Sequence, residues 1–198
     1  MTIREYIRQN WNVPNVLTMI RLLLVPVYVA LFALGEKYLA LTVFLLASFT
    51  DLLDGRIARK YNLITDFGKL MDPLADKVMV ITAMCSMAIG NKTIPAVIPW
   101  AAVIILFIKE LVMVIGSAVM LRYQIVVYST LIGKAAQCMF IASLVAVYFH
   151  EWFVTLCSDW FMTPDLILLW LSIVLSLVAL FIYVTRALRT AREQGIIR

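Results

Sequence analysis

Apolar runs of about 20 residues, the length of a helix that crosses a bilayer, recur along this chain and restrict its fold more than any other feature. Glycine, proline or charged residues separate six such runs, at 16–34, 39–58, 70–90, 95–121, 125–149 and 165–186. Of the 198 residues 64% are hydrophobic and 15% are charged, whereas soluble domains usually carry about 25% charged residues. The sequence therefore predicts an all-α integral membrane protein with six transmembrane helices, folded as a single domain over residues 1–198.

The first fourteen residues carry a different pattern, in which apolar side chains recur at helical spacing with arginines between them: Ile3, Tyr6, Ile7 and Trp11, with Arg4 and Arg8. A helix with an apolar side and a basic side lies on a membrane surface. We therefore expect a short amphipathic interfacial helix over residues 1–14. This segment lacks a short apolar core followed by a small-residue cleavage site, so a cleavable signal peptide is not expected.

Lysine and arginine are distributed unequally between the two sets of loops. One set, together with both termini, carries Arg4, Arg8, Arg56, Arg59, Lys60, Arg122, Arg186, Arg189, Arg192 and Arg198, whereas the other carries Lys37 and Lys92. Positively charged loops remain in the cytoplasm, so we expect a multi-pass protein of the cell membrane with both termini inside. The net charge of +5 then fits an anionic membrane surface, and no nucleic-acid partner is expected. His150, Trp152 and Trp160, in the last outer loop, are expected to be interfacial residues.

The most charged stretch of the chain holds two pairs of aspartates at helical spacing. Asp51 and Asp54 are three residues apart, and Asp72 and Asp76 are four apart, so each pair shares one face of a helix. Four carboxylates that point into one volume repel one another unless a cation lies among them. Oxygen ligands favour Mg²⁺ or Mn²⁺, and the chain has no Cys-His cluster of the kind that binds zinc. We therefore expect a divalent metal site.

Three further residues of this stretch suit a phosphate ligand. Gly55 and Gly68 lack a Cβ atom and allow a bulky group to approach the backbone. Arg59 can neutralise phosphate through a bidentate contact. Pairs of divalent ions commonly hold a phosphate between them. A site for metal and phosphate therefore explains these residues better than helix caps in a solvated loop would.

The same stretch resembles the signature of the CDP-alcohol phosphotransferases at all eight fixed positions, which are Asp51-x2-Asp54-Gly55-x2-Ala58-Arg59-x8-Gly68-x3-Asp72-x3-Asp76. The opening "VPNVLTMIRLLLVPV" is similar to the start of family members that make phosphatidylglycerophosphate and cardiolipin. The resemblance implies six spans, with the signature at residues 51–76 on the cytoplasmic ends of spans two and three. It also implies transfer of a phosphatidyl group from CDP-diacylglycerol to an alcohol, and a homodimer.

The resemblance assigns roles to the matching residues. It implies two divalent ions, Mg²⁺ or Mn²⁺, and makes Asp76 the general base as well as a metal ligand. The remaining metal ligands are Asp51, Asp54 and Asp72. The residues that bind the CDP-lipid are Gly55, Ala58, Arg59 and Gly68.

Basic residues outside the signature are candidates for reading the acceptor alcohol: Arg21, Lys109, Arg122 and Lys134. Charged residues within spans are costly, so Lys109 and the neighbouring Glu110 stand out. Family members of the glycerophosphate type often have an Arg-Glu pair there, and Lys109 departs from it because lysine lacks the guanidinium fork. For each of these residues, snorkelling to the interface or pairing with an acid is the structural alternative. The expected acceptor is glycerol 3-phosphate.

Other functions stay open at this point. Within the family, a cardiolipin synthase would use phosphatidylglycerol as the acceptor, and phosphatidylinositol-phosphate synthesis is less well supported. An intramembrane prenyltransferase would normally carry its aspartates in two separated repeats, whereas here all four lie in one helix-loop-helix. A cation transporter would need a polar path across the bilayer, yet the middles of spans five and six contain no acidic residue.

Overall fold

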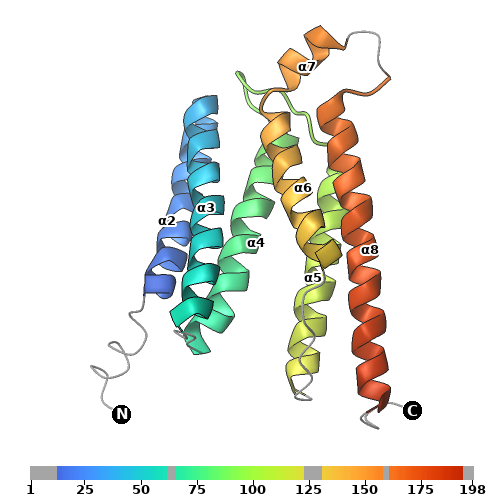
Figure 1. Cartoon of the computed structure of the whole chain (residues 1–198). Helices are drawn as coiled ribbons and strands as arrows, with labels where there is room; N and C mark the ends of the chain where they lie inside the picture. The colour runs from blue at the N-terminus through green and yellow to red at the C-terminus, as the bar shows by residue number, and fades with distance from the viewer. Residues whose placement is uncertain (1–12, 62–65, 123–130, 158–160, 194–198) are drawn as a thin grey trace. The chain divides into compact units, whose positions relative to one another are not determined.

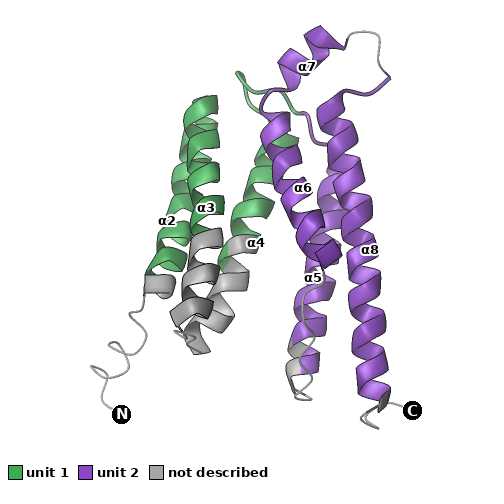
Figure 2. Ribbon diagram, viewed as in Figure 1, with its two compact units in different colours: residues 1–96 green, residues 97–198 purple. Residues whose placement is uncertain are grey.

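A computed structural model describes residues 13–61, 66–122, 131–157 and 161–193 of the chain (Figure 1). For residues 13–15, 51–61, 66–74, 76, 118, 121, 122 and 193, the structure describes the backbone but not the side chain. The regular structure in the described ranges is α-helical, which confirms the predicted all-α class there. The predicted interfacial helix, in contrast, falls almost entirely on residues 1–12, outside the described part. The chain divides into two compact units, Met1–Ala96 and Val97–Arg198 (Figure 2).

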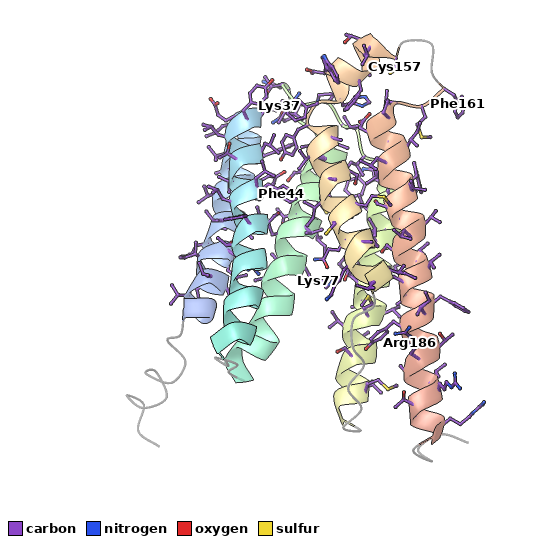
Figure 3. The ribbon with its side chains drawn as sticks, in the orientation of Figure 1. Lys37, Phe44, Lys77, Cys157, Phe161 and Arg186 are labelled. Atoms are coloured by element: carbon purple, nitrogen blue, oxygen red, sulfur yellow. The ribbon has the colours of Figure 1, made fainter. Side chains whose placement is uncertain are left out.

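The first unit contains the helices α2 (Val13–Ala33), α3 (Lys37–Tyr61) and α4 (Asp66–Ile89). Helix α2 packs against both of the others. Its core side contributes Tyr28 and Phe32, whose rings stack with centroids 6.1 Å apart. Helix α3 contributes the fully buried Ala40, Phe44 and Ala47 (Phe44 is labelled in Figure 3). Helices in a membrane associate through close van der Waals contact, and the small alanines permit that approach.

A hydrogen-bonded clasp centred on Asn91 joins the end of α2 to the segment that follows α4. The Asn91 side-chain amide donates to the carbonyl of Phe32, one of the last carbonyls of α2. Its Oδ1 accepts the backbone N–H groups of Thr93, at 2.9 Å, and of Ile94, at 2.6 Å. The Phe32 carbonyl also accepts the backbone N–H of Gly35 at 3.0 Å. The Asn91 clasp therefore adds a second hydrogen bond to this carbonyl and fixes α2 against the chain after α4.

The second unit contains α5 (Trp100–Arg122), α6 (Leu131–Val147), α7 (His150–Leu156) and α8 (Pro164–Glu193), and α8 packs against each of the other three. Ser143 of α6 and Ser172 of α8 are fully buried. Their hydroxyls donate at 2.7 Å to the carbonyls of Phe140 and Leu169 in their own helices. Because each hydroxyl is satisfied locally, these small side chains are buried without requiring a polar partner on another helix.

Three of the described helices contain stretches long and apolar enough to cross a membrane, namely Val16–Ala33, Trp100–Ser117 and Pro164–Arg192. A fourth candidate is the bent pair formed by α6 and α7. Helices α3 and α4 have shorter apolar stretches in the described part, at Lys37–Thr50 and Lys77–Ile89. The structure therefore supports several membrane-spanning helices.

Several boundaries differ from the sequence predictions, and α8 continues to Glu193 although span six was expected to end at residue 186. Span four was expected from residue 95, whereas α5 begins at Trp100, directly after Pro99. The Pro99 carbonyl accepts the N–H groups of Ala102 and Val103, so the helix forms from that point. The break expected over residues 150–164 is wrong for its first part, because α7 lies there.

The turn after α4 depends on Gly90, whose φ of +68° is unfavourable for residues with a Cβ atom. An added Cβ would also lie 2.6 Å from the backbone nitrogen of Ala96. We predict that Gly90→Ala destabilises the protein by about 2 kcal/mol. Thermal unfolding of the purified protein in detergent measures this as a lower midpoint.

Gly116→Ala is the matched control for Gly90→Ala. Gly116 lies inside α5, and an added Cβ would make an ordinary contact, 3.8 Å from Tyr183 Cε1. Alanine favours a helix interior over glycine by about 1 kcal/mol, so the midpoint is expected to stay the same or rise. Equal midpoints for the two variants would contradict the strain assigned to Gly90.

Candidate active site at the α3–α4 helix ends

The signature residues occupy the end of α3 and the beginning of α4, two helices that contact each other. Helix α3 carries Asp51, Asp54, Gly55, Ala58 and Arg59, and helix α4 carries Gly68, Asp72 and Asp76. The connecting residues 62–65 and the side chains of these eight positions lie outside the described part. Lys77, which follows Asp76 directly, is labelled in Figure 3. Both aspartate pairs therefore lie on helical backbone, as the spacing predicted.

The donor set of the signature fits a hard divalent cation, because it consists of four carboxylates on two contacting helices. Helical backbone at both pairs keeps the members of each pair on one face. Among the described residues, His, Cys, Asp and Glu form no group of three or more that could hold a metal ion. The side chains of the four signature aspartates are not among those described, and these residues stay the predicted metal ligands.

Arg21 lies in the same unit as the signature, on α2, which packs against both α3 and α4. Its side chain is 1% exposed, and Thr18, one turn earlier, is fully buried. A buried guanidinium in a helix that can cross a membrane is costly. Arg21 is thus the one acceptor-binding candidate from the sequence that lies in the unit of the signature helices.

The other three acceptor-binding candidates belong to the second unit. Lys109 lies in the middle of α5, where its Nζ is 2.5 Å from Oε1 of Glu110, and the two side chains are 12% and 19% exposed. This ion pair partly neutralises the lysine. Lys134 is exposed on the first turn of α6. Arg122 is the last residue of α5, and its side chain lies outside the described part.

A protein-family model described as CDP-alcohol phosphatidyltransferase matches residues 11–178 of the chain. This match covers most of the chain and includes every signature position. The chain belongs to the CDP-alcohol phosphatidyltransferase family. The resemblance seen in the signature residues is thereby confirmed over both compact units.

Curated relatives within this family share parts of the sequence. A protein of Rickettsia prowazekii named CDP-diacylglycerol–glycerol-3-phosphate 3-phosphatidyltransferase is 49% identical over 76 residues, covering 37% of this chain and 42% of its own length. A Pseudomonas fluorescens protein of the same name is 40% identical over 96 residues, covering 47% and 49%. A probable phosphatidylglycerophosphate synthase of Mycobacterium tuberculosis is 35% identical over 118 residues, covering 56% and 54%. The chain thus spans about half the length of these relatives.

One polar contact of this family member was missed by the sequence analysis. His150 was expected to be an interfacial residue, and Asp165 was assigned no role. In the structure His150 Nδ1 lies 2.7 Å from Oδ2 of Asp165. A separation of fifteen residues across a predicted loop gives no periodic signal, so the sequence could not have indicated this pair.

Proposed function

We propose that this protein transfers the phosphatidyl group of CDP-diacylglycerol to glycerol 3-phosphate, giving phosphatidylglycerophosphate and CMP. The observation that carries the proposal is the complete family signature on α3 and α4. It is supported by three relatives whose names specify phosphatidylglycerophosphate synthesis or its reaction. The substrates suit a membrane site, because CDP-diacylglycerol combines a water-soluble nucleotide with two acyl chains.

The proposal includes the arrangement of the whole chain in the cell membrane. Six helices (α2, α3, α4, α5, α6 and α8) cross the bilayer as a single domain, preceded by an interfacial helix over residues 1–14. Both termini and the signature face the cytoplasm, where the basic residues of the loops are concentrated. This places the signature helix ends level with the headgroups of the inner leaflet. We also propose that the protein forms a homodimer, as the family resemblance implies.

In this proposal Asp51, Asp54, Asp72 and Asp76 hold two divalent ions, Mg²⁺ or Mn²⁺. Such ions, when bound, stabilise the negative charge of a pyrophosphate and its leaving group. Gly55, Ala58 and Gly68 have little or no side chain and admit the CDP group close to the backbone. Arg59 pairs with phosphate oxygens through its guanidinium fork.

The reaction is a single displacement at the phosphorus that bears the diacylglycerol. Asp76 accepts the proton of the glycerol 3-phosphate hydroxyl, whose oxygen forms the new bond to that phosphorus. The bond between phosphorus and the bridging oxygen breaks, and CMP leaves with the electron pair. Arg59 stabilises the charge that develops on CMP. The chain's own residues thus orient the two substrates and take up the proton, and no covalent enzyme intermediate is needed.

Basic residues recognise the phosphate of the acceptor in this proposal. Arg21 is the strongest candidate because its buried guanidinium lies on a helix that contacts both signature helices. Lys134, Arg122 and Lys109, of the second unit, are the other basic residues that the sequence predicts to bind the acceptor. Of these three, Lys109 contributes least, since Glu110 already balances its charge.

The proposed reaction is tested with the purified full chain, labelled CDP-diacylglycerol and a panel of acceptors. We expect phosphatidylglycerophosphate and CMP with glycerol 3-phosphate, and no product with phosphatidylglycerol or inositol phosphate. Chelation of divalent ions should stop the reaction, and Mg²⁺ or Mn²⁺ should restore it. Product from phosphatidylglycerol alone would make the protein a cardiolipin synthase and refute the proposed acceptor.

Asp76→Asn tests the assignment of the general base. An amide cannot accept the hydroxyl proton, so turnover should fall by about 10²- to 10⁴-fold while CDP-diacylglycerol binding stays measurable. Asp66→Asn is the matched control, because Asp66 begins α4 but is not one of the eight signature positions. Turnover of Asp76→Asn comparable to that of the control would remove the role from Asp76.

Arg21→Lys tests acceptor recognition while preserving the charge. Lysine lacks the bidentate fork, so the KM for glycerol 3-phosphate should rise about tenfold, with a smaller change for CDP-diacylglycerol. Arg186→Lys is the control, because Arg186 is exposed on α8 (labelled in Figure 3). An equal rise in the KM of both substrates would show that Arg21 does not read the acceptor.

A further inference from the structure

Helix α7 departs from the direction of the long helix before it. Helices α6 and α7 are separated by Tyr148 and Phe149, and their axes make an angle of 77°. The two helices are apolar enough to count together as one broken span. If α6 crosses the bilayer, a helix at this angle to it runs close to the membrane plane. Figure 1 shows α7 turned across the end of α6.

The seven residues of α7, with Phe149 before them, form three distinct sides on the 3.6-residue repeat. One side is apolar and contains Phe149, Trp152, Phe153 and Leu156, of which Trp152 is 59% and Leu156 65% exposed. A second side contains the exposed Glu151 and Thr155. His150 lies between the other two sides, and none of the residues of α7 is buried.

His150 connects α7 to the start of α8. Its Nδ1 lies 2.7 Å from Oδ2 of Asp165, whose side chain is fully buried, while the histidine side chain is 20% exposed. Asp165 lies in the first turn of α8, where the free N–H groups favour a carboxylate. We call this contact the His150–Asp165 latch.

In the latch, the Asp165 carboxylate shares a hydrogen bond with His150 through Oδ2. The second oxygen, Oδ1, is buried and has no hydrogen-bond partner. Removing the partner of a buried carboxylate leaves a charge that the interior cannot accommodate. The segment that carries His150 is therefore held to α8 by an interaction that is costly to break.

We propose that α7 is an interfacial helix whose apolar side inserts into the headgroup–acyl boundary of the leaflet at the beginning of α8, and that the His150–Asp165 latch fixes its orientation. The partner is the lipid bilayer. Continuity with α6 and α8 supports this choice, because both border the segment and both carry long apolar stretches. Exposed aromatic rings next to a charged side are typical of the membrane interface.

The aromatic residues at both ends of the segment strengthen the assignment. Phe149 is 40% exposed before α7, and Phe161 after it is fully exposed and labelled in Figure 3. Trp152 packs edge-on against Phe153, with ring centroids 5.1 Å apart. Rings of this kind gain from burial in acyl chains while their edges remain near water. The inference concerns the lipid contacts of α7 and does not depend on the chemistry proposed for α3 and α4.

Site-directed spin labelling of the full chain in lipid nanodiscs tests the insertion. Leu156→Cys and Thr155→Cys are each labelled with a nitroxide after Cys85, Cys138 and Cys157 are replaced by serine. We expect the label at 156 to collide more often with oxygen than with a water-soluble nickel complex, and the label at 155 to show the reverse. Equal exposure of both labels to the nickel complex would overturn the proposal. Shielding of label 156 from both reagents would also overturn it, because protein would then cover this side.

The latch is tested in the same labelled proteins. His150→Ala should reduce the immobilised component of the spectrum at position 156 in part, as should Asp165→Ala. Val154→Ala, a change of an exposed α7 side chain outside the latch, should leave it unchanged. The double variant His150→Ala/Asp165→Ala should show no further loss beyond that of the single ones. Additive losses would mean that the two residues act independently and would refute the latch. His150→Gln, whose amide can still donate to Asp165, should retain the immobilised component and provides the test if His150→Ala does not fold.

Discussion

Hydrocarbon offers no hydrogen-bond partner to a peptide group, and this constraint shapes every described element of the protein. The regular backbone in the described ranges is helical, so most of its polar groups are satisfied locally. Ser143 of α6 and Ser172 of α8 follow the same rule by donating to carbonyls of their own helices. At the end of α2, the Phe32 carbonyl accepts both the Gly35 N–H and the Asn91 side-chain amide. With the polar groups accounted for in this way, small residues can bring the helices into close contact.

Charged side chains inside such helices are costly, so each group of them calls for a partner or a function. The signature positions lie on the end of α3 and the beginning of α4, two helices that contact each other. Arg21 is buried on the helix that contacts both of them. Lys109 and Glu110 balance each other inside α5, and Asp165 is paired with His150 at the start of α8. The family membership gives a chemical reason for the first group, while the last two pairs are explained by the cost of an unpaired charge.

Much of this could be read from the sequence, because membrane helices produce long apolar runs. The run over 16–34 corresponds to α2 at Val13–Ala33, and Gly35 marks its end with a φ of +83°. The signature was recognisable because its spacing is fixed along the chain, although the side-chain geometry of those residues stays a prediction. Two features were not predictable. Helix α7 is too short to produce a clear period, and the Asn91 clasp joins groups 59 residues apart, a pairing that exists only after the helices have packed.

The clasp also sets the helical phase of α2. Phe32 follows Arg21 by eleven residues, which is about three full turns, and both side chains are buried. With the Phe32 carbonyl held in place, adding or deleting one residue between these positions would rotate the guanidinium by about 100° and move it along the axis by about 1.5 Å. The arginine would then face a different neighbour or the lipid. A length change close to whole turns would instead keep the guanidinium on the face of α2 that it occupies now.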